Sequence, residues 1–228
     1  MLYIDEGLLQ EPGRQHPWTV SAQNPEWKYY DFKKNPELIP QVLEDFKPFE
    51  HHAAIQRFYE LVAWLNGPDS KFETSDARFD GIKPNTQKDK WNKELACHGG
   101  FVTLYRNLKY NLSEDSRTWS NQKILHGKNP ATSYQPSRYL KWMSEQSGHL
   151  IQQITPGFMY GCIGTGFLKV YCLDGAADNR DKFGYQLIYR FWAWGDTEEE
   201  IMKNLMVDFE ALFQCVKKLS SEVPEEKS

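Results

Sequence analysis

Residues 184–219 read GYQLIYRFWAWGDTEEEIMKNLMVDFEALFQCVKKL, and this stretch decides the fold. Its first part, 185–194, is rich in aromatic residues and predicts a β-strand. Gly195 and Asp196 then interrupt the pattern. Beyond them, apolar residues recur every three or four positions, which predicts one long amphipathic helix. Its expected buried stripe consists of Ile201, Leu205, Phe209, Leu212, Val216 and Leu219.

Acidic residues mark the start of this helix. Asp196 is expected to be the cap, because its side chain can accept a hydrogen bond from the amide of Glu199. The carboxylate of Glu199 would then reach back to the cap, as in a capping box. Glu198 and Glu200 also suit the positive end of the helix dipole.

A second strand precedes the first. Residues 167–173 have strand composition, and residues 174–184 are mostly polar, charged or small. A crossover between parallel strands usually needs its own helix, for which this connection is short. We therefore predict that the two strands pair as a long antiparallel hairpin.

The earlier sequence predicts further elements. Helices are expected over 36–43, 50–65, 115–125 and 137–151, strands over 77–82 and 101–105, and a helical turn over 90–97. Neither a regular strand–helix alternation nor a GxGxxG loop is present, which argues against a Rossmann domain. The pattern predicts an α+β fold, in which a small, mainly antiparallel sheet packs against several helices and the C-terminal helix is long and amphipathic.

We expect the whole chain, residues 1–228, to form a single α+β domain. Prolines interleave with aromatic residues over about the first 35 positions, which predicts an irregular, aromatic-rich N-terminal arm that packs on the body. A chain of 228 residues, 14 % of them aromatic, can bury a core without help from a disulfide or a metal. The N-terminus lacks the apolar segment of a signal peptide, and no segment suits a membrane span. A soluble, cytoplasmic protein is therefore predicted.

The four cysteines are Cys97, Cys162, Cys172 and Cys215, and none are in CxxC spacing. Cys162 and Cys172 are close enough in sequence to pair. Without a secretion signal, however, reduced and buried thiols are the favoured interpretation.

Arg190 lies in the middle of the predicted strand 185–194. Because side chains alternate along a strand, it shares a face with Trp192 and Trp194. A guanidinium in such surroundings must pair with an acid, stack on a ring or face a cleft. A structural ion pair, or a solvent-facing residue whose stem is covered, is the favoured interpretation, and a contact with an anion or a partner protein, flanked by the two tryptophans, is the other.

His98 belongs to the run CHGGF at 97–101. A His-Gly-Gly run before a strand can offer backbone amides to an oxyanion. The nucleophile motif GxSxG is missing from the chain, however, so the favoured interpretation is a glycine turn, at Gly99 and Gly100, that ends a short helix.

His51 and His52 follow Glu50 at the start of the predicted helix 50–65. Adjacent residues on a helix point in different directions, so these two imidazoles would share a metal ion poorly. A solvated helix start is favoured, and no metal or cofactor site is predicted.

Charge is distributed unevenly. Residues 101–145 hold seven Lys and Arg against three Asp and Glu, interleaved with aromatic residues, and could contact single-stranded nucleic acid. Solvated faces are the favoured interpretation, since the whole chain has a net charge of −4. Acidic residues that could pair with a basic protein partner are Asp69, Glu73, Asp76, Asp80, Asp196, Glu198, Glu199 and Glu200. Ordinary solubilising and capping charge is the favoured interpretation of these residues.

The leading functional prediction is a non-enzymatic protein-interaction protein, for which a bacterial inhibitor, immunity-type or accessory protein is one concrete form. Its candidate binding residues are Arg190, Trp192, Trp194 and His98. Abundant Tyr and Trp suit a recognition surface, and the sequence shows no catalytic constellation. The alternative is a hydrolase-like enzyme that uses His98 or a carboxylate in a cleft beside the sheet. A nucleic-acid contact through 101–145 is the third possibility.

Overall fold

The computed structural model describes residues 6–7, 32–33, 35–106, 110–111, 136–155, 160–171 and 183–223. The predicted helix over 115–125, most of the N-terminal arm and Cys172 lie outside these residues. Within the described part of the chain, no helix combines the length and the apolar character needed to cross a membrane.

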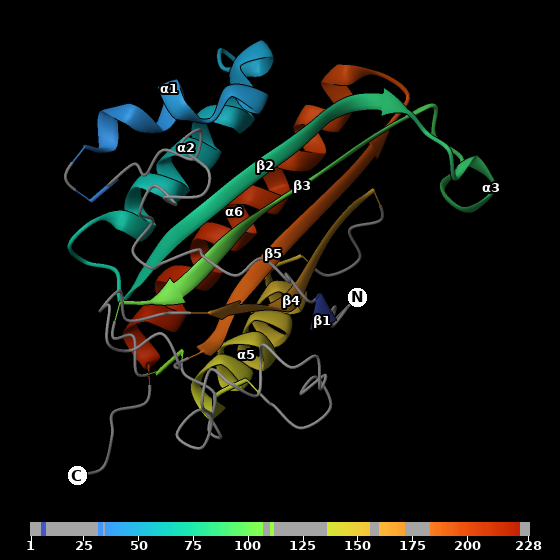
Figure 1. Cartoon of the computed structure of the whole chain (residues 1–228). Helices are drawn as coiled ribbons and strands as arrows, with labels where there is room; N and C mark the ends of the chain where they lie inside the picture. The colour runs from blue at the N-terminus through green and yellow to red at the C-terminus, as the bar shows by residue number, and fades with distance from the viewer. Residues whose placement is uncertain are drawn as a thin grey trace, which may run out of the picture.

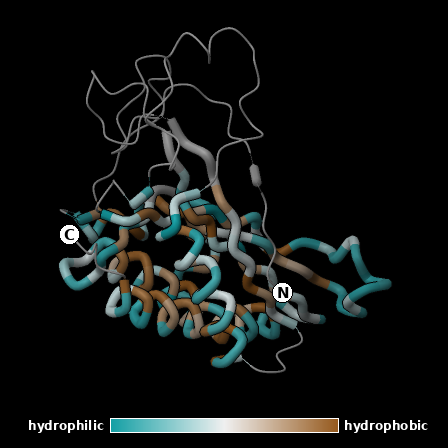
Figure 2. Tube along the Cα trace, turned by 90° about the horizontal axis from the view of Figure 1, so that it is seen from below, coloured by the Kyte–Doolittle hydropathy of each residue, from teal (hydrophilic) through white to brown (hydrophobic). Residues whose placement is uncertain are grey.

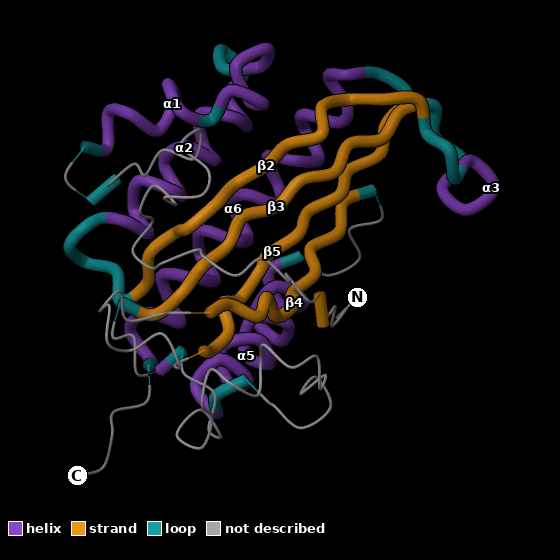
Figure 3. Tube along the Cα trace, viewed as in Figure 1, coloured by secondary structure: helices purple, strands orange, loops and turns teal. Residues whose placement is uncertain are grey.

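A five-stranded sheet in the order β1-β4-β5-β3-β2 forms the centre of the molecule (Figure 3). The strands are β1 (Glu6–Gly7), β2 (Phe72–Pro84), β3 (Leu95–Tyr105), β4 (Gly161–Tyr171) and β5 (Phe183–Gly195). All neighbouring strands pair in antiparallel fashion except β1, which runs parallel to β4. The predicted antiparallel hairpin is confirmed as β4 and β5, and the shorter predicted strands lie within β2 and β3.

Helices cover one face of this sheet (Figure 1). The helices of the described residues are η1 (Pro36–Leu38), α1 (Ile39–Val42), η2 (Glu44–Phe49), α2 (Ala53–Asn66), α3 (Lys88–Trp91), α5 (Arg138–Ile154) and α6 (Glu198–Glu222). Three of them, α2, α5 and α6, pack on the sheet, while α3 sits in the connection between β2 and β3. The predicted α+β fold and its long C-terminal helix are confirmed.

The core lies between the sheet and the helices, where Figure 2 shows the hydrophobic residues gathered. The rings of Phe58 in α2, Phe191 in β5 and Phe209 in α6 meet there. Phe58 and Phe209 have centroids 5.0 Å apart, and Phe191 and Phe209 have centroids 4.9 Å apart. All six residues of the predicted apolar stripe of α6 are buried, because their spacing places them on one side of the helix.

The cap of α6 is one residue later than predicted. Thr197 is the N-cap, and its hydroxyl accepts a hydrogen bond from the amide of Glu200. Glu200 reaches back to the amide of Asp196, at 2.8 Å. The carboxylate of Asp196 is instead bound to Lys93, at 2.6 Å. A long-range ion pair thus replaces the predicted local cap.

The predicted helical turn over 90–97, ending in glycines, is also wrong in extent. Helix α3 ends at Trp91, and β3 runs straight through His98, Gly99 and Gly100. A Cβ at Gly99 would stand 2.4 Å from the ring of Phe191. The glycine is therefore needed so that the neighbouring strand can place a full aromatic ring beside it.

Candidate functional site

All four predicted binding residues lie on the outer face of the sheet, which is the side opposite α2, α5 and α6. Trp192 pairs in register with His98 of β3 and Cys162 of β4, and Trp194 pairs with Ala96. The intervening residues of β5 point inward and are buried. The predicted alternation of this strand is confirmed.

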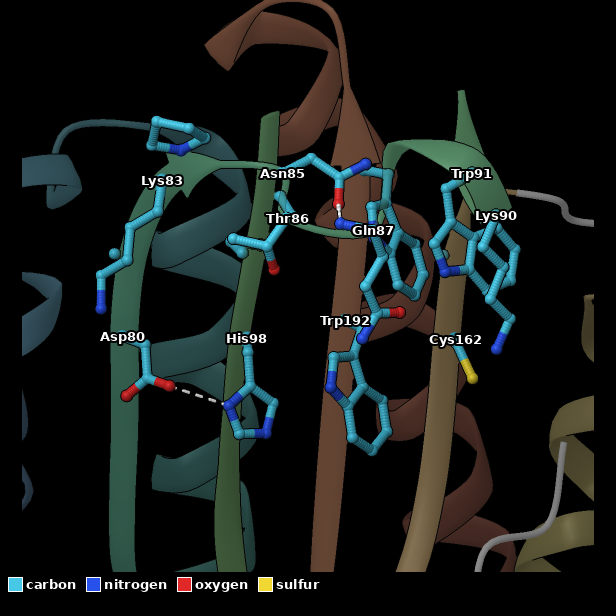
Figure 4. Close-up of a pocket in the computed structure, with 16 residues that line it drawn as sticks. Asp80, Lys83, Asn85, Thr86, Gln87, Lys90, Trp91, His98, Cys162 and Trp192 are labelled. Carbon is cyan, nitrogen blue, oxygen red and sulfur yellow. Dashed lines mark hydrogen bonds and ion pairs between the residues drawn. The ribbon is translucent and has the colours of Figure 1, made fainter. Parts of the chain in front are cut away.

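A cavity of about 800 Å³ opens on this face at the end of the β2–β3 hairpin (Figure 4). Its lining includes Trp91, Trp192, Trp194, His98 and Asp80, and we call it the aromatic pocket. The rings of Trp91 and Trp194 stack with centroids 4.2 Å apart, and those of His98 and Trp192 stack at 5.2 Å. The volume lies within the range typical of ligand sites.

Asn85 fixes the connection that brings Trp91 to this site. Its side chain is buried, accepts a hydrogen bond from the amide of Gln87 at 2.9 Å, and donates one to the carbonyl of Lys93 at 2.8 Å. Both ends of the connection are therefore tied to one side chain. Asn92 follows α3 in a left-handed conformation, with φ of 46°, which turns the chain back into β3.

An ion cluster ties the same connection to the start of α6. Lys93 Nζ lies 2.6 Å from the carboxylate of Asp196 and 3.3 Å from that of Glu200. The hydrogen bond to Asp196 raises the pKa of Lys93, and the same bond lowers the pKa of Asp196. The pKa of Glu200 is also lowered, first by the amide of Asp196 and then by Lys93. Trp91 is thus held over the outer face from two directions.

Asp80 and His98 form a pair at the edge of the aromatic pocket. Asp80 Oδ2 lies 2.8 Å from His98 Nδ1, and Figure 4 shows the other ring nitrogen turned away from Asp80. Phe79 pairs with Gly99, and this register of β2 with β3 places Asp80 opposite His98. The bulge comes directly after Asp80, where Gly81 takes a φ of 72° that other residues adopt rarely. A carboxylate on Nδ1 orients the imidazole and leaves Nε2 available as a base.

Cys162 lines the pocket on the far side of Trp192. It is separated from His98 by one intervening strand, so their Cα atoms are roughly 10 Å apart. Burial raises the pKa of the Cys162 thiol, which disfavours the thiolate. His98 is therefore not placed to deprotonate Cys162 directly.

Arg190 lies one residue pair farther along the same face, outside the pocket lining. Its register partners are Gly100 and Gly164, so no side chain rises beside it on β3 or β4. Arg190 is half-buried, and its side chain or backbone takes part in an interaction with another residue. The structure places it next to the aromatic pocket.

The other predicted sites are dispersed. His52 is the N-cap of α2, where its Nδ1 accepts a hydrogen bond from the amide of Ala54 at 3.1 Å. Tyr105 and Tyr139 of the basic region are buried in the core. Among the acidic residues, Glu73 forms an ion pair with Lys33. None of these side chains lines the aromatic pocket.

Sequence reasoning missed Trp91 and the partnership of Asp80 with His98. Trp91 lies far from the strand of Trp194 in the sequence, and a short polar helix carries it. Asp80 was noted only as part of an acidic cluster. The glycine after Asp80 is a signal of a bulge, but its consequence depends on the strand register, which local sequence does not specify.

No protein-family model, curated protein or solved structure matches this chain.

Proposed function

We propose that this chain is a non-enzymatic protein-interaction protein that uses the outer face of its sheet for docking. The observation that carries the proposal is the gathering of His98, Trp192 and Trp194 around one cavity of about 800 Å³. Tryptophans in a pocket are characteristic anchors of protein interfaces, because they bury a large area at a small entropic cost.

The pocket also indicates the kind of partner. Its stacked aromatic walls suit an apolar or aromatic side chain. Lys83 and Lys90 also line it, whereas the charge of Asp80 faces His98. We therefore infer an anchor side chain flanked by carboxylates, since complementary charge speeds and orients association.

We also propose that the protein works in the cytoplasm. Cys97, Cys162 and Cys215 carry free thiols, and burial raises the pKa of Cys97 and of Cys215 to about 12. Inert thiols suit a reducing, cytoplasmic compartment. An inhibitor or immunity-type partner of a bacterial toxin remains one concrete form of such a protein.

Affinity capture from a lysate of the native cell tests the docking face. The purified wild type, Trp192→Ala and Trp64→Ala are used as baits, and captured proteins are quantified by mass spectrometry. Trp64 is a matched control because it packs against Phe213 in the helical layer, on the other side of the molecule. Melting curves show first that both variants are folded.

The expected result is a protein captured by the wild type and Trp64→Ala and reduced about tenfold or more with Trp192→Ala, as for an interface anchor. High salt should also weaken the capture, because charged rims are screened. Equal capture by all three baits would overturn the proposed docking face.

A second candidate, a hydrolase-like enzyme, is favoured by one observation, the 2.8 Å contact between Asp80 and His98. An imidazole oriented in this way can act as a general base on water, beside a pocket that could hold a substrate.

Screening of chromogenic ester and amide substrates tests this candidate. Hydrolysis by the wild type that is lost in His98→Gln, and lowered in Asp80→Asn with little change of KM, would support it. Activity that persists in His98→Gln would exclude His98 as the base.

A further inference from the structure

A second cavity, of about 410 Å³, opens between α5, α6 and the first half of β4. Its volume is within the range of small-molecule sites. Glu145 and His149 line it from α5, Thr165 from β4 and Asp208 from α6. Gly161 and Cys162 line both cavities, but Thr165 and Asp208 lie on the inner side of the sheet, away from the docking face.

Asp208 is the unusual residue of this cavity. Only 2 % of its surface is exposed, and its Oδ2 has no hydrogen-bond partner in the described part of the chain. The amide of Cys162 is the one group whose hydrogen bond favours its charged form. Desolvation outweighs that bond and raises the pKa of Asp208 well above its ordinary value.

A buried carboxyl with an unsatisfied oxygen calls for a functional explanation. No lysine or arginine is among the described residues that line the cavity, so no ion pair accounts for Asp208. The outer wall carries a second carboxylate, that of Glu145, which is exposed. The described lining of the cavity therefore contains two carboxyl groups, those of Glu145 and Asp208, and no lysine or arginine.

The two carboxyl groups determine which class of ligand the cavity can bind. An anion would be repelled by Glu145 and by ionised Asp208. A metal ion is disfavoured, because the described residues contain no group of three or more His, Cys, Asp or Glu side chains arranged to hold one. An organic cation needs only one desolvated carboxylate and a few neutral acceptors, which Gln152 and Thr155 can supply.

We propose that this cavity binds a primary ammonium group, carried by a small amine or by a lysine side chain, with Asp208 as its ion-pair partner. Ile151 and Ile163 also line the cavity and would contact the alkyl stem. The ammonium group would give Oδ2 the donor that it lacks.

Proton balance gives this proposal a signature. The ammonium keeps its own proton, and Asp208 must lose one to pair with it, so binding releases about one proton. At pH values below the pKa of Asp208, the affinity for the ammonium group should then rise about tenfold for each unit by which the pH is increased. Glu145, His149 and Cys162 face the same cavity, so the Asp208 variant is needed to separate the effect of Asp208 from theirs.

The test is a titration of nitrogen-15-labelled protein with n-butylammonium, followed through the amide signals of Cys162 and Thr165 at several pH values. Neutral n-butanol is the isosteric control. Calorimetry in two buffers of different ionisation heat counts the released protons. A lysine derivative blocked at both backbone ends tells whether a protein-borne lysine fits as well as a free amine.

We expect n-butylammonium to bind at least about tenfold more tightly than n-butanol, since a hydrogen bond to a charged group is strong. Asp208→Asn should lose that preference and the proton release, whereas Asp69→Asn, an exposed acid elsewhere, should behave as the wild type. Melting curves check that Asp208→Asn folds.

Three results would overturn the proposal: equal binding of amine and alcohol, unchanged amine binding in Asp208→Asn, or no response of the wall amides to either probe. Binding of both amine probes, or of the small amine alone, would support it and identify the source of the ammonium group.

Discussion

The two faces of β5 differ although they alternate along one strand. Tyr189 and Phe191 point inward and are fully buried. Arg190 and Trp192 point outward and are half-buried. On the inner face Tyr189 Oη lies 2.7 Å from the hydroxyl of Ser147, so its polar atom is satisfied. On the outer face the rings surround a cavity.

This difference teaches where stability and recognition are located. The inner face is filled by rings from three elements, so a missing atom there leaves a void that the structure closes poorly. The outer face already borders open space, so a truncated side chain loses few contacts. We expect inward residues of β5 to control folding and outward residues to control binding.

The largest expected effect separates the two faces directly. Phe191→Ala should lower the free energy of unfolding by about 3–5 kcal/mol, because it removes a ring from the core. Trp192→Ala should lower it by no more than about 1.5 kcal/mol, the scale of one stacked pair. Urea denaturation of both variants measures this, and equal losses would contradict the division of roles.

A second prediction concerns the contact between the strands at Gly99. Gly99→Ala should cost about 1–3 kcal/mol of stability, since the new Cβ would overlap the ring of Phe191. In the double variant, Phe191→Ala removes the ring but not the carbonyl oxygen of Arg78, which lies 2.6 Å from the new Cβ. The two losses should then add to less than their sum, with part of the Gly99→Ala loss remaining. Simple additivity in urea denaturation would show that the two residues do not interact.

A third prediction uses the pKa of Asp208, which burial raises above its ordinary value of 3.8. At pH values between 3.8 and the raised pKa, Asp208 keeps a proton in the folded protein that it has lost in the unfolded chain. The wild type should therefore lose up to about 1.4 kcal/mol of stability per pH unit in this window as the pH rises.

Asp208→Asn removes this dependence. Its stability relative to the wild type should increase from pH 4 to pH 7, as followed by denaturation at a series of pH values. Parallel curves for the two proteins would show that Asp208 has the same pKa in the folded and the unfolded chain.

The smallest effect is expected at Arg190. If its guanidinium belongs to a structural pair, Arg190→Ala should lower the melting temperature by roughly 2–4 °C, the shift that about 1 kcal/mol produces in a chain of this size. Lys203→Ala, an exposed change on α6, serves as the control. An unchanged melt of Arg190→Ala would refute the structural pair and leave the binding interpretation.

Much of the fold could be predicted from local sequence. The strand at 185–194 and the helix that follows it were recognisable because a strand repeats every two residues and a helix every 3.6. The hairpin of β4 and β5 followed from the length of its connection. These features depend on neighbours in the chain, which a sequence displays directly.

The errors have a common physical cause. The local sequence predicted Asp196 as a helix cap, but its carboxylate forms an ion pair with Lys93, more than one hundred residues earlier. Gly99 looked like a turn, but the ring of Phe191 requires a glycine there. In each case a contact distant in sequence outweighed the local preference, and the one-letter pattern contains no information about that contact.

The candidate sites divide in the same way. The sequence by itself determined that Trp192 and Trp194 share a face with Arg190, because alternation along a strand is a local property. Only the tertiary structure decided that Trp91 covers Trp194, that the register of β2 with β3 places Asp80 opposite His98, and that Asp208 is buried beside a cavity. Strand register and helix packing are set by the whole core at once, and they determine which distant side chains become neighbours.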